Sequence, residues 1–192
     1  MLSLKHVVAA LVGIFFLSAQ ACLAGPFGTN MGDKKEQYKN LTPAGDDAYM
    51  TRDVPLPHSA FKQYFLCFGG SGLNAVAALS EYKNDKFGTS AQNEYIKIKK
   101  QLISKYGTPE TREFLRDGAL YKEDAYFVAS LYKSERVHCA VWKFEKARDG
   151  VKMIILGLSG ESFSQCNLFI NYDYENRKEA EEKKASHENN AL

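Results

Sequence analysis

Residues 137–174 read VHCAVWKFEKARDGVKMIILGLSGESFSQCNLFINYDY, and this stretch decides what kind of sheet the chain builds. It contains three apolar runs, Val137–Phe144, Val151–Leu158 and Cys166–Tyr174. The segments between them, EKARDG and SGESFSQ, are short and rich in turn-forming residues. The pattern therefore predicts three consecutive antiparallel strands, each paired with the next.

A hairpin is predicted upstream of this meander. Phe61–Phe68 is rich in aromatic residues and Leu73–Ser80 is apolar, and the glycine cluster GGSG at 69–72 separates them. Two apolar runs joined by glycines indicate a β-hairpin. The glycines do not form a phosphate loop, because a strand follows them where that loop needs Lys-Ser/Thr at the start of a helix.

The clearest helix is predicted over Thr89–Tyr106. Its apolar residues recur at steps of three and four, and its lysines take the other positions. Thr89 and Gln92 have the spacing of a capping box at its start. Gly107 and Pro109 end it, because glycine favours a helix C-terminus and proline cannot continue one.

The other segments carry weaker patterns. Helices are predicted over 122–133 and, from a capping-box pattern at Asp33 and Glu36, over 33–41. A short strand is expected near 48–51, and 111–120 is either a loop or a short strand. The order of elements indicates an α+β fold with a single antiparallel sheet of about five strands and helices packed on one face. This domain is predicted to span 25–174.

Both ends of the chain differ in composition from this domain. Val7–Leu17 is an apolar run of eleven residues after a lysine-containing start. It is too short to span a bilayer and is typical of a secretory signal peptide over residues 1–24. Between 175 and 188, nine of fourteen residues are charged. Residues 175–192 are therefore expected to be a solvated helix extension or a disordered tail.

Two cleavage sites compete. Cys22-Leu23-Ala24 predicts a mature protein that begins at Gly25, whereas Ala19-Gln20-Ala21 allows a cut before Cys22. The first is favoured, because Gly25 starts a turn-like segment clear of the apolar run. The second would allow a lipid anchor at Cys22, but Ala19 and Gln20 do not fit the usual lipidation pattern.

Charge and composition give no indication of a nucleic-acid partner, a metal or a cofactor. Removing residues 1–24 leaves 168 residues and removes one lysine and no acid, so the formal charge falls from +2 to +1. This balance does not indicate nucleic acid as a partner. The chain contains no C-x-x-C pair, and its histidines are scattered, so no metal site and no cofactor are predicted.

The cysteine pairing stays open. Cys67, Cys139 and Cys166 remain after cleavage, so at most one bridge can form. In the predicted meander, Cys139 lies opposite about Leu156 and Cys166 opposite about Leu158. A whole strand then separates the two cysteines by roughly 9.6 Å, which is too far for a disulfide. Either a bridge uses Cys67 or all three thiols are free.

No set of side chains indicates catalysis. His138 and Cys139 are adjacent on a predicted strand and therefore point to opposite faces. The pairs Glu123-Asp124 and Asp46-Asp47 are neighbours in sequence, and side chains at successive helical positions diverge. A site formed by Cys67 or Cys139 with a distant histidine, His58 or His138, remains an alternative. His187 lies in the tail.

Tyrosine is the one unusual feature of the composition. The chain has eleven Tyr, twelve Phe and one Trp. Half of the tyrosines on predicted elements should reach the surface, where Tyr and Trp are enriched in protein interfaces. Ordinary core and rim packing is the alternative explanation of the aromatic content, and it is the favoured one. The tyrosines considered are Tyr64, Tyr82, Tyr95, Tyr121, Tyr126, Tyr132, Tyr172 and Tyr174.

The segment PFGTNMGDKKEQ at 26–37 resembles the FG…MGM…E start of an uncharacterised family of small exported bacterial proteins, some of them lipoproteins. The resemblance continues through PLPHSAFKQYFLCF, GLNAVAALSEY and FGTSAQNEYIKIKKQLISKYGTPE, and spans most of 26–144. The chain departs from the family at Asp33 and at Gly72-Leu73. The resemblance implies an envelope location and carries over no catalytic residue. MGDKKEQ alone is also similar to SmpA/OmlA-type outer-membrane assembly lipoproteins.

Two functions follow as hypotheses. The first is an exported bacterial envelope protein that acts as a non-catalytic binding or assembly module with an envelope protein as its partner. The second is a small exported hydrolase with Cys139 or Cys67 as nucleophile. The first is favoured, because export, small size and abundant aromatic residues support it and no catalytic set is present.

Overall fold

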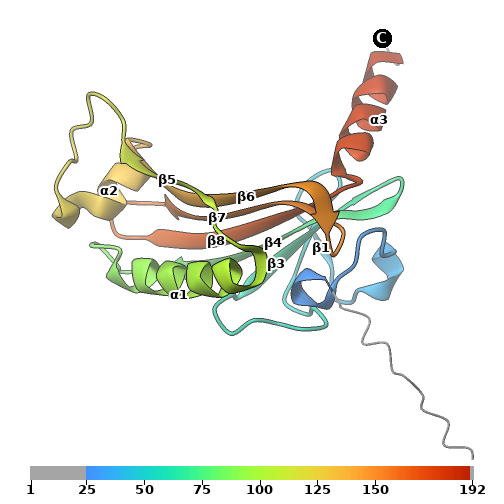
Figure 1. The fold of residues 1–192 in the computed structure, drawn as a ribbon, viewed down its shortest axis with the longest axis horizontal. Coiled ribbons are helices and arrows are strands. Elements are labelled where there is room, and N and C mark those ends of the chain that lie inside the picture. Colours follow the sequence, from blue (N-terminus) through green and yellow to red (C-terminus); the bar gives the residue numbers. More distant parts are fainter. Residues whose placement is uncertain (1–24, 191–192) are drawn as a thin grey trace, which may run out of the picture.

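Two runs of consecutive strands form one antiparallel sheet in the computed structural model, which describes residues 25–190 (Figure 1). The strand order is β1-β2-β3-β4-β8-β7-β6-β5, so the last strands of the two runs, β4 and β8, meet in the middle. The predicted signal peptide, the two cleavage sites and Cys22 lie outside the described residues. The strands are β1 (Thr42–Pro43), β2 (Ala48–Thr51), β3 (Gln63–Gly69), β4 (Gly72–Tyr82), β5 (Glu110–Leu115), β6 (Arg136–Arg148), β7 (Val151–Gly160) and β8 (Cys166–Tyr174).

The predicted fold class was wrong. An α+β fold with a sheet of about five strands was expected, but the sheet has eight, and strands account for 39% of the structure against 26% for helices. Of the three strands outside the hairpin and the meander, β2 confirms the short strand expected near 48–51, β5 lies where 111–120 was left open between a loop and a short strand, and β1 was not predicted. All three are short or exposed, so they show little hydrophobic alternation. Backbone hydrogen bonds to the neighbouring strands hold them in place. Because these bonds do not depend on the side chains, they give no hydrophobic pattern in the strand's own sequence.

The predicted meander is confirmed, but its register is shifted. β6, β7 and β8 are consecutive neighbours. Cys139 pairs with Gly157 and Cys166 with Gly160, whereas Leu156 and Leu158 were expected opposite them. Most of EKARDG belongs to β6, which continues to Arg148 through an irregularity, so the turn contains only Asp149 and Gly150.

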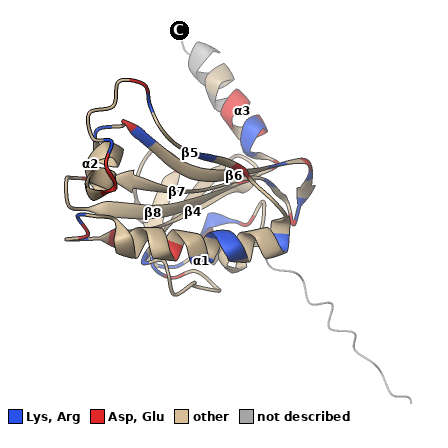
Figure 2. Cartoon of the chain, turned by 60° about the vertical axis from the view of Figure 1, so that its left-hand side comes forward, with Lys and Arg blue, Asp and Glu red and all other residues tan. Residues whose placement is uncertain are grey.

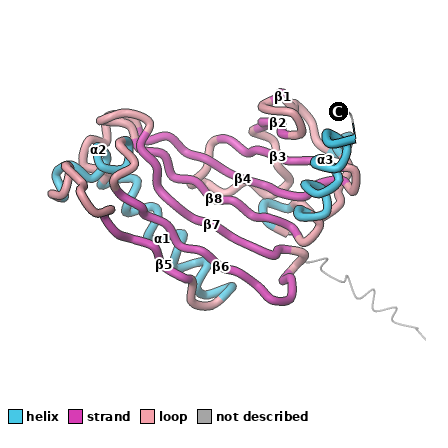
Figure 3. The backbone as a smooth tube through the Cα atoms, turned by 90° about the horizontal axis from the view of Figure 1, so that it is seen from above, coloured by secondary structure: helices cyan, strands magenta, loops and turns pink. Residues whose placement is uncertain are grey.

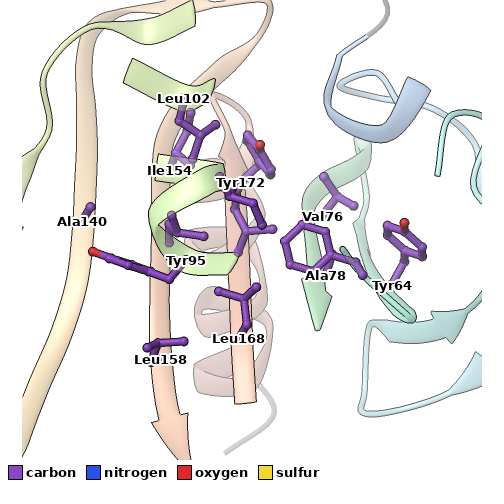
Figure 4. Packing of buried hydrophobic residues seen from close by; sticks show 14 of the residues in the cluster. Tyr64, Val76, Ala78, Tyr95, Leu102, Ala140, Ile154, Leu158, Leu168 and Tyr172 are labelled. Atoms are coloured by element: carbon purple, nitrogen blue, oxygen red, sulfur yellow. The ribbon is translucent and has the colours of Figure 1, made fainter. Parts of the chain in front are cut away.

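One face of the sheet carries the core, and the long helix α1 (Thr89–Tyr106) packs against it through β7 and β8. Tyr95 and Leu102 of α1 point towards side chains of the sheet (Figure 4). Burial of this face provides the main driving force for folding. The sheet residues labelled there are Tyr64, Val76, Ala78, Ala140, Ile154, Leu158, Leu168 and Tyr172.

The helix over 89–106 is confirmed, but its predicted cap is not formed. Gly88 precedes it in a left-handed conformation with a φ of 69°. Its first turn is held by Asp85, whose Oδ2 accepts a hydrogen bond from the amide of Ala91 at 3.0 Å. Thr89 is already the first helical residue, so it cannot act as the cap.

Of the two other predicted helices, the one over 122–133 forms over most of its length and the one over 33–41 does not. In 122–133 a 3₁₀ turn (Asp124–Tyr126) leads into α2 (Phe127–Tyr132), which packs on β7 and β6. In 33–41 only the 3₁₀ turn Lys35–Gln37 forms, and the Gln37 side chain accepts a hydrogen bond from the Lys34 amide at 3.1 Å. Residues 127–131 of α2 are all buried. The turn Lys35–Gln37 has no buried residue, so no continuous buried stripe supports a longer helix over 33–41.

The start of the described chain closes one end of the core. The ring of Phe27 makes edge contacts with Phe61, Tyr64 and Tyr172, with centroids 5.8, 4.9 and 5.7 Å away. The buried hydroxyl of Thr29 lies 2.7 Å from that of Tyr174 at the end of β8. The segment at 25–29 is therefore an integral part of the fold.

The opposite face of the sheet is open. Figure 3 views the sheet from this side, with α1 behind it. The helix α3 (Arg177–Asn190) leaves from the end of β8 and rises on the side away from α1 (Figure 1). It passes close to Gly69, where a Cβ would lie 2.8 Å from the Cβ of Ala180. Charges of both signs are spread over α1, α3 and the loops beside α2 (Figure 2).

None of the helices among residues 25–190 is long and apolar enough to cross a membrane.

Candidate functional site

Four aromatic rings form a continuous exposed cluster at the end of the sheet where α2 lies. The centroids of Tyr121 and Tyr126 are 5.7 Å apart, and those of Tyr121 and Phe163 are 6.0 Å apart. Phe163 also contacts Tyr132 at 5.1 Å. Tyr126, Tyr132 and Phe163 are 44%, 40% and 47% exposed. We call these four residues, together with Leu120, the aromatic tip.

The loop before α2 holds Leu120 out into solvent. The side chain of Leu120 is 83% exposed, whereas Ala119 beside it is buried. The Glu135 carboxylate accepts hydrogen bonds from the amides of Leu120 and Tyr121, at 3.0 and 2.8 Å. The amide of Arg116 donates to the Glu135 carbonyl at 2.7 Å. The loop is thus pre-organised, which lowers the entropy cost of binding.

A close approach of β7 to α2 brings the other two rings together. A Cβ on Gly160 would lie 2.3 Å from the backbone nitrogen of Tyr132, so only glycine fits there. The turn between β7 and β8 then places Phe163 beside Tyr132. The ammonium group of Lys133 lies 5.1 Å from the Tyr132 centroid and 5.2 Å from that of Phe163. The tip thus combines apolar rings with hydroxyl groups and a cation, a composition that suits protein interfaces.

The eight tyrosines considered from the sequence differ in burial in the structure. Four of the eight are buried, which matches the expected half, while Tyr82 and Tyr121 are partly exposed. Sequence reasoning missed Leu120 and Phe163, because both lie in segments interpreted as connections. Large apolar residues inside turn-rich segments were the signal that could have identified them.

His138 belongs to a polar cluster between α1 and the sheet edge. Its ring lies 4.7 Å from that of Tyr95 and 5.2 Å from that of Phe127. Burial lowers the pKa of His138, although the nearby Glu113 carboxylate opposes this shift. Glu113 accepts hydrogen bonds from the Tyr95 hydroxyl at 2.8 Å and from the Lys99 ammonium at 2.7 Å. These bonds keep the pKa of Glu113 below its ordinary value despite burial.

This cluster joins β5 to α1 and contains no nucleophile. Cys139 lies on the open face, opposite to its neighbour His138, as the alternation along β6 requires. Burial raises the pKa of the Cys139 thiol and so disfavours the thiolate that a nucleophile needs. His58 accepts a hydrogen bond from the amide of Ala60, and its ring lies tilted against that of Phe61, with the centroids 5.8 Å apart. The structure therefore does not bring Cys139 together with either histidine.

The three cysteines are free and lie in different environments. Cys166 is buried on the core face, and burial raises its pKa to about 12. Cys139 lies on the open face with β7 between it and Cys166. Cys67 lies on the open face near the guanidinium group of Arg177, at the base of α3. Neither Cys67 nor Cys139 faces Cys166, so the described arrangement does not position Cys166 for a bridge.

The remaining sequence candidates have structural roles. The glycines at 69–72 form the β3–β4 turn, as expected, and a Cβ on Gly72 would meet the carbonyl of Gly32 at 2.3 Å. Glu123 and Asp124 start the 3₁₀ turn before α2. Asp46 and Asp47 lie between β1 and β2, and both have interaction partners. Among residues 25–190, no group of three or more His, Cys, Asp or Glu side chains could hold a metal ion.

Comparisons of the chain with protein-family models, with curated proteins and with solved structures give no match.

Proposed function

We propose that this chain is an exported bacterial envelope protein that acts as a non-catalytic binding module and contacts an envelope protein through the aromatic tip. The observation that carries the proposal is the continuous contact of four partly exposed rings beside a strongly exposed leucine. Aromatic side chains dominate binding energy at protein interfaces, because they bury a large area and lose little conformational entropy.

The tip fits a binding role better than a structural one. Leu120 buries almost none of its side chain within the chain, so it adds little to folding stability. Even so, the Glu135 carboxylate holds the backbone of this residue in one conformation. A rigid loop with an exposed aliphatic residue at its end favours association with a second molecule.

The proposed binding can be tested by site-specific photo-cross-linking in intact cells. A photoreactive phenylalanine analogue at Phe163 should give an adduct with an envelope protein. Ile96 on α1 is the matched control, because it has the same exposed fraction, 47%. Leu120→Asp should abolish the Phe163 adduct and leave the unfolding temperature unchanged, since this side chain is exposed. Equal adducts from both positions, or an adduct insensitive to Leu120→Asp, would contradict the proposal.

Export predicts a defined mature N-terminus. We expect N-terminal sequencing of the protein released by osmotic shock to begin at Gly25. A cut further downstream is disfavoured, because Gly25 is buried and donates to the Oδ1 of Asn30 at 3.3 Å, and Phe27 packs against the core. A mature chain that began at Cys22 with an acyl group would instead support a lipoprotein.

A further inference from the structure

β5 is an edge of the sheet. It pairs with β6 on one side and has no neighbouring strand on the other within the described part of the chain. Five of its six residues are exposed. An exposed edge presents unpaired backbone groups, which makes it a template for pairing with another strand.

The register identifies the free backbone groups of β5. The amide of Arg116 donates to the carbonyl of Glu135, directly opposite it in the ladder. Because hydrogen-bonded and non-hydrogen-bonded pairs alternate in an antiparallel ladder, Arg112 and Phe114 also direct their backbone groups towards β6. Thr111 and Glu113 therefore direct their N–H and C=O groups to the free edge.

The side chains at this edge restrict what can pair with it. Glu110 and Arg112 lie on the open face and form an ion pair, with 2.6 Å between Oε1 and Nε. Charged side chains at an edge, and a proline before it such as Pro109, discourage pairing with an arbitrary strand. A strand that pairs here must bring opposite charges to these two positions.

We propose that β5 pairs with β5 of a second copy of this chain, antiparallel, about a two-fold axis perpendicular to the sheet at Thr111. In this register Glu110 lies directly across from Arg112 of the second copy. By symmetry, Arg112 lies directly across from Glu110 of the second copy. Opposite charges directly across an antiparallel pair are stabilising. The chain thus supplies the complementary charges itself.

The neighbouring registers are electrostatically worse. A two-fold axis at Arg112 places Arg112 directly opposite its own copy. An axis at Glu113 likewise places Glu113 directly opposite its own copy. Like charges directly opposite are destabilising. Only the axis at Thr111 combines opposite charges with free backbone groups at its centre.

This pairing also covers exposed apolar surface. Phe114 is 51% exposed on the open face, and the proposed register places it across from Thr108 of the second copy. Pro109 limits the number of hydrogen bonds at each end because it has no N–H. Two short strands form a small interface, so the dimer should be weak and depend on concentration.

Disulfide trapping tests the register on the full-length mature chain with Cys67→Ser and Cys139→Ser. Thr111→Cys should form a covalent dimer under mild oxidation, because Cα atoms of a hydrogen-bonded pair are about 5.5 Å apart. Thr108→Cys is the matched control, because Thr108 is also an exposed threonine. In this register its two copies lie roughly 20 Å apart, six residue spacings along the strand. Cross-linking at 108 but not at 111, or equally slow cross-linking at both, overturns the proposal.

Charge exchange tests the same interface without cysteines. Arg112→Glu should weaken dimerisation about tenfold in analytical ultracentrifugation, because both cross-strand pairs become repulsive. Glu110→Arg combined with Arg112→Glu should restore it. Unchanged unfolding temperatures show that each variant is folded. A parent protein that stays monomeric up to about 1 mM, a concentration at which a millimolar Kd is detectable, or a double variant that stays dissociated, refutes the second-copy pairing.

Discussion

Ile98→Asp should leave the domain unfolded at 37 °C. Ile98 lies on the inner stripe of α1 and is only 4% exposed. The substitution removes a buried aliphatic side chain and places a carboxylate without a partner in the core. These two effects together should cost about 4 kcal/mol or more, a large part of the usual stability of a domain.

The loss of stability is measured by circular dichroism during heating, with an exposed position on the same helix as control. Lys99 is unsuitable as a control because its ammonium is paired with Glu113 at 2.7 Å. Lys100 is exposed on the same helix, so Lys100→Asp should change the free energy of unfolding by less than about 0.5 kcal/mol. If Ile98→Asp and Lys100→Asp melted alike, the assignment of the inner face of α1 would be wrong.

Gly160→Ala should displace α2 and with it the aromatic tip. The added Cβ would lie 2.3 Å from the nitrogen of Tyr132 and 2.6 Å from its Cα. Backbone atoms of a packed helix cannot move aside as a side-chain end can, so the helix must shift from β7. We expect a loss of about 3 kcal/mol, the upper end of what overpacking costs.

Gly157→Ala on the same strand is the matched control for this effect. Its Cβ would meet the ring of Phe169 at 2.6 Å, and this ring lies on the open face, where it can turn away. The cost should be smaller, about 1 kcal/mol. Hydrogen exchange should accelerate at 127–132 in Gly160→Ala but not in Gly157→Ala. The same exchange pattern in both variants would show that Gly160 does not determine the position of α2.

Predictions from sequence succeeded where one element buries a continuous apolar pattern. Thr89–Tyr106 was assigned at both ends, because its buried residues recur with the period of a helix and Gly107 ends it. β6, β7 and β8 were recognised as neighbours for a similar reason. Their exact register was not, because it depends on the irregularity between Lys143 and Arg148, which only the paired strand reveals.

Predictions stayed open, as for β5, or failed, as for 33–41, where an element lacks a continuous buried face of its own. β5 shows almost no buried residue, and it exists because β6 supplies its hydrogen bonds and Lys99 pairs with Glu113. The segment at 33–41 had a capping-box pattern but no continuous apolar stripe, and it forms a single 3₁₀ turn. Local signals at a helix start do not extend a helix without a face to bury.

The amino-acid sequence by itself determined the elements that carry their own apolar periodicity, namely the hairpin of β3 and β4, α1 and the strands β6–β8. It also showed an excess of aromatic residues without showing where they meet. Only the tertiary structure decided the eight-stranded order, the free edge at β5 and the aromatic tip. In the aromatic tip, Tyr121, Tyr132 and Phe163 come from segments up to about forty residues apart. Contacts between such distant segments are decided by the packing of the whole chain rather than by local preference.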